Sequence, residues 1–270
     1  GRVFSFIFTK STVTASAANL MGEVLRFERF PYDENTVSTI ASFINKMTTD
    51  DPNVYGVTII TEDKSEIPSS AFPWPVTYTS RSSAQARAEL EEESLEKCLF
   101  VSWSDSIEAS YMDRFLHDIP TFGHMKVTKG VPCTCGGNGC LNAVASGVVL
   151  KERTGLTQYR KLLSEEKGIL AIDDAGKGMV FAISEAVQAM GAERVMITGE
   201  LSGMSDDLYA SLNDALKMSL PPSREHIRIR KAKRGDKGLL EGASLIALDE
   251  FFYHKAILEE LTTIQDKANF

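Results

Sequence analysis

One short stretch of the sequence constrains the fold more than any other, because it gathers four side chains that commonly bind metal ions. Three of the four cysteines lie within eight positions, and a histidine lies nine residues before the first of them. Three thiolates and one imidazole form a ligand set that suits a closed, tetrahedral, structural Zn2+ site. The predicted metal ligands are His124, Cys133, Cys135 and Cys140.

Glycines between these ligands support the same interpretation. Gly136, Gly137 and Gly139 permit the sharp turns, partly with positive φ, that a loop of this spacing needs. Two alternatives stay open, namely a disulfide between two of the cysteines and reduced thiols that simply pack. A disulfide framework is typical of small secreted chains, and this sequence shows no signal peptide. The pattern therefore favours zinc, and we interpret the fourth cysteine, Cys98, as a buried core residue.

The size and charge of the chain limit its organisation and its partners. Its 270 residues exceed the usual size of a single hydrophobic core, so two lobes are expected. The net charge of -8 argues against a nucleic-acid-binding surface, which needs concentrated Lys and Arg. No apolar run is long enough to span a membrane, so we expect a cytoplasmic location without membrane contact.

Hydrophobic patterning predicts a first lobe over residues 1–96. Its elements follow the order β, β, β, α, β, and a Pro-rich segment then leads to a short strand and an Ala- and Glu-rich helix. A hairpin followed by a β-α-β unit is the core of a ribonuclease H-like lobe. The expected strands are 3–9, 12–19, 22–30, 54–61 and 76–79, and the expected helices are 37–47 and 82–97.

A second lobe is predicted over residues 97–237. The alternation of β and α elements in both halves indicates an α/β protein with two sheet-centred lobes. A closing helix over residues 238–268 is a candidate to pack back on the first lobe. The other elements expected here are strands 97–103, 107–111, 194–198 and 226–232 and helices 141–153 and 175–191, with a further helix starting near Asp206 and Asp207.

The cysteine loop and its neighbours resemble the ROK family of repressors, open reading frames and kinases. The family pattern combines Glu-x-Gly-His, Cys-x-Cys-Gly-x-x-Gly-Cys-Leu-Glu and Ala-x-Ser-Gly. This sequence reads TFGH from Thr121, CTCGGNGCLN from Cys133, and ASG from Ala145. The resemblance implies a two-lobed actin-like ATPase fold and a structural zinc held by the four ligands named above.

Both phosphate loops of the family's kinases are altered here. After the first strand the chain reads IFTKSTVT instead of an acidic, glycine-rich loop, and after LFVSW it reads SDSIEASYM instead of a second one. Backbone N–H groups cradle phosphates only where glycines allow close approach, so we expect no ATP binding. The family's Asn-Asp pair, whose Asp is the general base, corresponds to Ser80 and Arg81. Arg stays protonated at physiological pH, so we expect no enzyme activity.

Sugar recognition is reduced in the same way. The family's two sugar-binding glutamates correspond to Thr121 and Asn142, which leaves His124 as the matched sugar contact. Losing these carboxylates removes several hydrogen bonds of about 1–3 kcal/mol each. The candidate ligand-binding residues, Ser80, Arg81, Thr121, His124 and Asn142, therefore suit a sugar or sugar-derived effector bound weakly.

Three functions are compatible with this sequence. The favoured one is the non-catalytic, zinc-stabilised effector and dimerisation region of a ROK-type, sugar-responsive transcriptional regulator that acts as a homodimer. Its DNA-binding domain would lie outside this sequence, and the strand-like start directly after Arg2 leads us to expect it upstream. The second is a divergent ROK sugar kinase, with Asp105, Asp173 or Asp174 as candidate bases. The third is a degenerate scaffold that acts through protein contacts.

Overall fold

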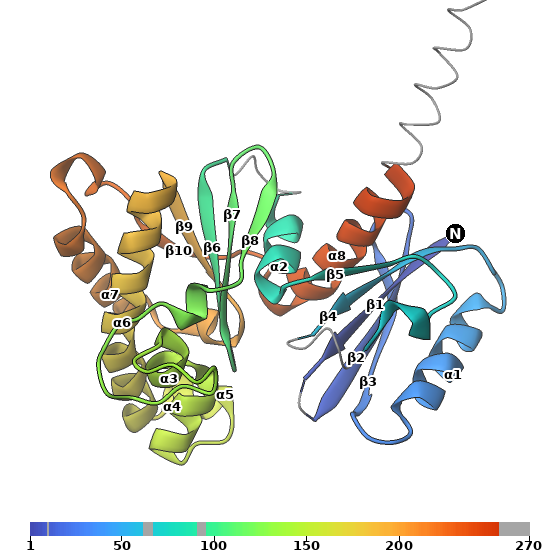
Figure 1. The fold of residues 1–270 in the computed structure, drawn as a ribbon, viewed down its shortest axis with the longest axis horizontal. Coiled ribbons are helices and arrows are strands. Elements are labelled where there is room, and N and C mark those ends of the chain that lie inside the picture. The colour runs from blue at the N-terminus through green and yellow to red at the C-terminus, as the bar shows by residue number, and fades with distance from the viewer. Residues whose placement is uncertain (10, 62–66, 91–95, 254–270) are drawn as a thin grey trace, which may run out of the picture. The chain divides into compact units, whose positions relative to one another are not determined.

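The computed structural model describes residues 1–9, 11–61, 67–90 and 96–253. It has an α/β fold with two five-stranded sheets, each at the centre of one compact unit (Figure 1). The first unit combines Gly1–Ser80 with the chain from Lys237 onward, and the second unit is Arg81–Asp236. The predicted α/β class with two sheets is confirmed.

The sheet of the first unit has the strand order β3-β2-β1-β4-β5, with β1 antiparallel to β2 and parallel to β4. One short 3-10 helix, η1 (Ser69–Ala71), precedes the last strand. The strands and helices are β1 (Arg2–Phe8), β2 (Thr12–Asn19), β3 (Val24–Pro31), α1 (Thr36–Thr48), β4 (Val54–Ile60), β5 (Val76–Thr79), α8 (Gly235–Leu248) and the π-helical turn η5 (Asp249–Tyr253).

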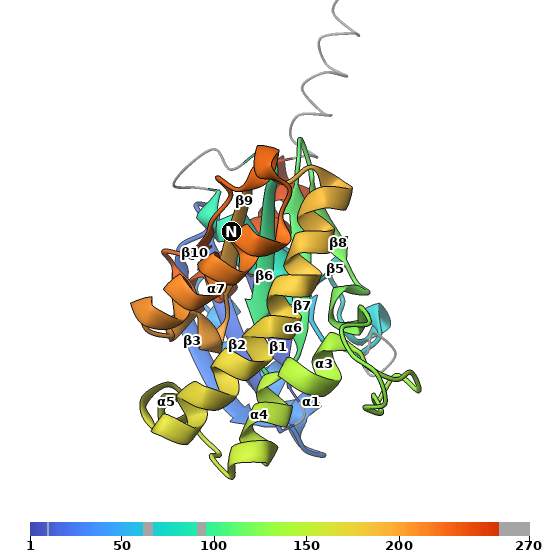
Figure 2. The same cartoon turned by 90° about the vertical axis from the view of Figure 1, so that its left-hand side faces the viewer.

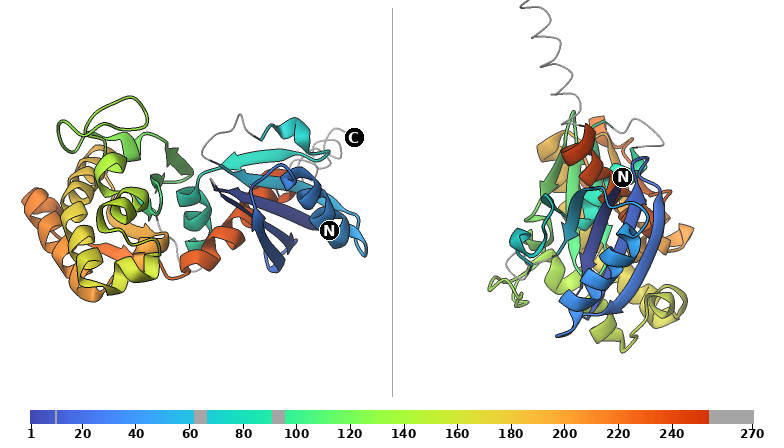
Figure 3. Two further views of the ribbon diagram at one scale, coloured as in Figure 1. Left: turned by 90° about the horizontal axis from the view of Figure 1, so that it is seen from below. Right: turned by 90° about the vertical axis from the view of Figure 1, so that its right-hand side faces the viewer.

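Alternation along β1 explains how both faces of this sheet are covered. Phe4 and Phe6 point to one face and pack with Phe43 of α1, whereas Val3 points to the other face and packs with Leu248 of α8. Successive strand residues face opposite sides, so a fully apolar strand is buried on both. Figure 3 shows α1 and α8 on the two sides of this sheet.

The sheet of the second unit has the order β10-β9-β6-β7-β8, with β6 parallel to β9 and antiparallel to β7. Short 3-10 helices lie at η2 (Phe122–His124), η3 (Glu200–Gly203) and η4 (Pro222–Arg224). The remaining elements are α2 (Arg81–Glu89), β6 (Cys98–Trp103), β7 (Ile107–Met112), β8 (Leu116–Ile119), α3 (Leu141–Ala145), α4 (Gly147–Thr154), α5 (Tyr159–Ser164), α6 (Glu166–Met190), β9 (Arg194–Thr198), α7 (Asp206–Ser219) and β10 (Ile229–Lys231).

The same alternation builds the main core of the second unit. Leu99, Val101 and Trp103 of β6 face the side covered by α6 and α7, while Cys98 and Phe100 face α2. Figure 2 shows α6 and α7 crossing in front of the sheet. Cys98 is fully buried, as the sequence predicted.

The helix α2 places the division between the units earlier than the sequence boundary at residues 96 and 97. Its Ala86 packs with the second sheet, and Gln85 accepts a hydrogen bond of 2.6 Å from the hydroxyl of Thr198. Near its end the buried Glu89 carboxylate accepts the backbone N–H groups of Lys233 and Arg234. These contacts fix α2 to the second sheet, so the units divide at Ser80 and Arg81 instead.

The closing helix belongs to the first unit. The structure gives α8 the span Gly235–Leu248, and Leu245 and Leu248 pack with Val3 and Ala18 of the first sheet. The predicted helix extended to residue 268, and its part beyond residue 253 lies outside the described residues. Across the described parts of the chain, no helix combines the length and apolarity that crossing a membrane requires.

One helix predicted from the sequence is divided into two helices in the structure. The run at 141–153 was expected to be continuous, but Ser146 adopts extended backbone angles between α3 and α4. Its side-chain oxygen accepts the N–H of Val149, so it caps the second helix. This break turns the chain shortly after the cysteine loop.

Candidate functional site

The four predicted metal ligands lie together in the second unit. One ligand atom from each of His124, Cys133, Cys135 and Cys140 falls within 4.8 Å of all the others. The Cys133 Sγ is 3.7 Å from the His124 Nδ1, and the Cys135 Sγ is 3.7 Å from the Cys140 Sγ. A tetrahedral ion with metal–sulfur bonds of about 2.3 Å separates its sulfurs by about 3.8 Å. The donor set and its spacing therefore fit a four-coordinate metal ion.

Backbone pairing brings these ligands together. The cysteine loop forms a small hairpin, in which the Cys133 N–H donates to the Gly137 carbonyl at 2.8 Å and the Gly139 N–H donates to the Val131 carbonyl at 2.7 Å. Gly139 has a φ of +76°, and a Cβ there would lie 1.9 Å from the Thr128 carbonyl oxygen. Only glycine fits that position.

The three thiols differ in environment, and none forms a disulfide. The Gly137 N–H lowers the pKa of the exposed Cys135 thiol by hydrogen bonding to its sulfur. Burial, followed by hydrogen bonds with the neighbouring thiols, raises the pKa of Cys140 to about 11. Close packing of ionisable sulfurs disfavours several thiolates at once, so a bound cation would relieve the repulsion between them.

Of the candidate ligand-binding residues, His124 belongs to this cluster, and Thr121 and Asn142 lie beside it. Thr121 precedes η2, and its carbonyl accepts the N–H of His124 at 2.9 Å. Asn142 is the second residue of α3 and packs against Gly123, where an added Cβ would meet its amide nitrogen at 2.3 Å. The amide oxygen of Asn142 accepts the Ile107 N–H at 2.8 Å, so this side chain also fixes the start of β7.

The other two candidates, Ser80 and Arg81, stand at the division between the units. Ser80 ends the first unit, and Arg81 begins α2 in the second. The Arg81 N–H donates to the Glu108 carboxylate at 2.8 Å, so a carboxylate of β7 already occupies the N-terminus of α2, where an anion is favoured.

A second polar cluster lies in the loop after β6. Asp105 accepts hydrogen bonds of 2.5 Å from the Lys151 ammonium and from the Tyr159 hydroxyl, and the Lys151 nitrogen lies 4.1 Å from the centre of the Tyr159 ring. We call these three residues the Asp105 cluster. Partial burial acts against ionisation of Asp105, but the bonds from Lys151 and Tyr159 outweigh it and lower the pKa of this carboxyl. Asp105 is therefore a carboxylate at neutral pH.

Glu200 adds negative charge to this region. It follows Gly199, whose φ of +82° allows the turn to approach so closely that a Cβ would meet the Ser104 Oγ at 2.3 Å. Burial raises the pKa of Tyr159 first, and the carboxylates of Asp105 and Glu200 raise it further.

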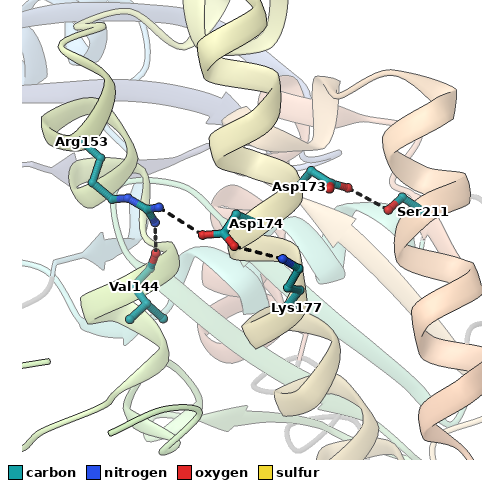
Figure 4. Close-up of polar contacts among 6 residues, drawn as sticks. All are labelled: Val144, Arg153, Asp173, Asp174, Lys177 and Ser211. Atoms are coloured by element: carbon teal, nitrogen blue, oxygen red, sulfur yellow. Dashed lines mark hydrogen bonds and ion pairs between the residues drawn. The ribbon is translucent and has the colours of Figure 1, made fainter. Parts of the chain in front are cut away.

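Asp173 and Asp174, the other candidate bases, lie on α6 in contact with further side chains (Figure 4). Asp173 accepts from the Ser211 hydroxyl at 2.7 Å. Asp174 accepts from Arg153 at 3.1 Å and from Lys177 at 3.2 Å. Each carboxylate therefore accepts hydrogen bonds from side chains of the same chain.

Sequence reasoning missed Glu108, Lys151, Tyr159 and Glu200. Glu108 is the second residue of a mostly buried strand, so nothing in the pattern marks it as a helix cap. Lys151 and Tyr159 are 46 and 54 residues from Asp105 in sequence, and only the tertiary fold joins them.

Comparison with known proteins places this site in a family. A sequence model described as "ROK family" matches residues 119–250, which include all four predicted metal ligands. This region is a ROK family domain. The chain is also 26% identical over 156 residues to a glucokinase of Halalkalibacterium halodurans, and that alignment covers 47% of each chain. The match thus spans about half the length of that curated relative.

Solved structures share the fold over nearly the whole chain. A ROK family transcriptional regulator described as a homolog of the E. coli MLC protein has a TM-score of 0.72 and 17% identity, covering 91% of this chain and 77% of that one. The ROK hexokinase of Thermus thermophilus also has a TM-score of 0.72, with 19% identity, covering 93% of this chain and 99% of that one. These likenesses confirm the predicted two-lobed fold of the ROK sugar kinases and repressors.

Proposed function

We propose that this chain is the non-catalytic effector and dimerisation region of a ROK-type, sugar-responsive transcriptional regulator. Its DNA-binding domain would be a separate part of the protein, and its four-ligand cluster would hold a structural Zn2+. The fold is common to regulators and kinases, so the proposal depends on the site residues.

The observation that carries it is the Asp105 cluster. The resemblance to ROK kinases puts a glycine-rich phosphate loop after β6, and here that loop contains an ionised carboxylate bonded to Lys151 and Tyr159. A carboxylate repels the phosphates of ATP. It is also already paired with the Lys151 ammonium, to which a phosphate would otherwise bind. The nearby Glu200 carboxylate acts in the same direction.

Backbone donors around this loop are occupied as well. The Ser104 N–H donates to the Ser106 carbonyl at 3.1 Å, the Ile107 N–H donates to Asn142, and the Arg81 N–H donates to Glu108. A phosphate cradle needs several N–H groups aimed at one anion. These three N–H groups already donate to acceptors within the chain, which supports the absence of kinase activity.

The metal would have a positional role at the effector site. His124 ends η2 and Cys140 immediately precedes α3, so one ion held by both would fix Thr121 and Asn142 relative to each other. Zinc supplies no redox chemistry, and four protein ligands close its coordination sphere. The proposed effector is therefore a small polar molecule of the sugar class, bound beside a rigid loop.

A direct test combines nucleotide binding with turnover. Calorimetry with ATP and Mg2+ should give no measurable heat, and a coupled assay with glucose, N-acetylglucosamine or N-acetylmannosamine should give no sugar-dependent ADP. An active ROK glucokinase, assayed in parallel, shows that the method detects turnover. Sugar-dependent ADP production that disappears in Asp105→Asn would overturn the proposal.

A divergent sugar kinase is the second candidate, because the glucokinase similarity covers 156 residues. It would need a general base other than Arg81. The same coupled assay separates the two functions.

A further inference from the structure

Two of the predicted metal ligands, Cys135 and Cys140, are a closely spaced pair of thiols that differ in exposure. Their Sγ atoms are 3.7 Å apart, and neither cysteine is in a disulfide. Cys135 is exposed, whereas Cys140 is buried, with 3% of its surface accessible. The two sulfurs must approach each other by about 1.7 Å to bond, which a rotation about the Cα–Cβ bond of Cys135 can supply. A dissolved oxidant can therefore reach the first sulfur, and the second lies within reach of it.

Gly137 leaves one side of this thiol pair uncovered. A Cβ added there would lie 3.4 Å from the Cys135 Sγ and 3.5 Å from the Cys140 Sγ, which is ordinary van der Waals contact. Apart from the chain neighbours of Gly137, no other atom of the described residues lies within 4 Å of that point. Cys133 and His124 are thus farther away, so the uncovered side faces away from the other two ligands. Because Gly137 is also partly exposed, a small solute can approach both sulfurs there.

We propose that Cys135 and Cys140 are a peroxide-sensitive thiol pair, reached over Gly137, whose disulfide takes two ligands from the metal site. The proposal rests on the metal site proposed above and adds a means of controlling it. Cysteine binds metal as a thiolate, and a disulfide sulfur no longer has that form. Only His124 and Cys133 would remain, and a structural zinc site needs four ligands.

The oxidation needs hydrogen peroxide and no other reactant. The Cys135 sulfur attacks one peroxide oxygen, the O–O bond breaks and hydroxide leaves, which gives a sulfenic acid. The Cys140 sulfur then attacks the Cys135 sulfur, the S–O bond breaks, and a second hydroxide leaves. The two thiol protons convert these hydroxides to water, and two electrons pass from the sulfurs to the peroxide. A dithiol reductant reverses the change.

The other two cysteines are less suited to this reaction. Cys133 is separated from Cys135 by one residue, so a bond between them would close a small ring with little freedom to reach the dihedral angle near 90° that a disulfide prefers. Cys98 is fully buried in β6, out of contact with solvent. We therefore expect Cys98 to stay reduced when the pair oxidises.

Gly137→Ala tests the pair without changing a metal ligand. Gly137 does not have a positive φ, so alanine fits the backbone, and its methyl group would contact both sulfurs. In the full chain purified with zinc, an about tenfold excess of hydrogen peroxide should release the metal to a chromogenic chelator, and peptide mapping should find a Cys135–Cys140 disulfide. The variant should purify with the same zinc content and release it at least about fivefold more slowly, because the methyl group covers the approach.

Control variants separate access to the pair from general effects. Gly178→Ala adds the same methyl group 3.3 Å from the Val127 Cγ2, and Cys98→Ala removes the buried thiol. Both should release zinc at a rate within about twofold of wild type, and thermal unfolding checks that each variant is folded. Met21 and Met218 are 76% and 89% exposed and also take up oxygen from peroxide. The disulfide is therefore scored by the mass of its linked peptides, about 2 Da below that of the two reduced peptides.

The outcomes distinguish this proposal from the metal site on which it rests. Zinc that stays bound under peroxide, or that leaves while Cys135 and Cys140 remain unlinked, overturns the proposal, and so does release from Gly137→Ala at the wild-type rate. Dithiothreitol with added zinc should restore the metal content, and failure to do so contradicts reversibility. A chain that purifies without zinc contradicts the metal site instead, and a Cys135–Cys140 disulfide formed by that metal-free chain would still support the thiol pair.

Discussion

The four predicted metal ligands and the Asp105 cluster are both compact polar groups of the second unit, but they differ in how their charge is balanced. Four electron-pair donors converge within 4.8 Å in the first, and only a cation or bound protons can stabilise that arrangement. In the second, one carboxylate is paired with an ammonium group and a hydroxyl of the same chain. A cation or protons from solution can stabilise the first group, whereas side chains of the same chain stabilise the second.

Removing metal should therefore have the largest effect. Chelation, or Cys140→Ser, should destabilise the second unit by about 3 kcal/mol or more and lower its melting temperature by about 5–10 °C, because folding and metal binding are coupled. Elemental analysis of protein purified without added metal should find one zinc per chain. Cys98→Ala, in a buried strand away from the ligands, should keep that zinc. Metal-free protein that unfolds like the untreated sample would refute this expectation.

A pH titration of the metal-free protein should show the next largest effect. The buried Cys140 thiol has a pKa raised to about 11, so the folded state holds this proton more tightly than the unfolded state does. The contribution of this protonated thiol to the stability of the fold is complete below the ordinary thiol pKa and is lost as pH rises through about 11. Urea unfolding from pH 8 to 11 should show this decline in wild type, and Cys140→Ala should reduce it.

Asp105→Asn should have a smaller effect. The carboxylate is more than half exposed, so solvent screening limits the loss to about 1 kcal/mol at pH 7. The Asp105 pKa is lowered in the fold, so this contribution is present above the ordinary Asp pKa and disappears as pH falls through the lowered value. In chemical unfolding, the difference between variant and wild type should be largest at pH 7 and should shrink as the pH is lowered below the ordinary Asp pKa.

Tyr159→Phe should have the smallest effect. It removes the hydroxyl that donates to Asp105 but keeps the ring beneath the Lys151 ammonium. We expect a loss of about 0.5 kcal/mol, because the Lys151 contact to Asp105 remains. A loss larger than that of Asp105→Asn would mean that the Tyr159 hydroxyl, and not the carboxylate, organises the cluster.

Much of the fold could be predicted from local pattern. Continuous apolar runs such as VFSFIF and CLFVSW predicted buried strands, and they form β1 and β6. The convergence of His124 and the three cysteines could be predicted for the same reason, because three of these four residues lie within one short loop.

Features set by tertiary contacts could not be predicted. Nothing in LNAVASGVVLKER shows that Ser146 leaves the helix, because the break depends on the Gly147 N–H donating to the Ser104 carbonyl of another loop. Likewise, α2 looks like a polar surface helix, yet Gln85 and Glu89 are buried because Thr198, Lys233 and Arg234 supply hydrogen bonds. Sequence polarity alone assigns such side chains to solvent.

The buried Glu89 carboxylate joins the beginning of the second unit to its end. It ties the first helix of the second unit to Lys233 and Arg234, only a few residues before that unit ends. The second unit therefore behaves as an inserted domain whose two chain ends are clamped to each other from within. We expect residues 81–236 to be excisable as an autonomous module, whereas the two outer segments would need a short artificial linker between Ser80 and Lys237 to fold without it.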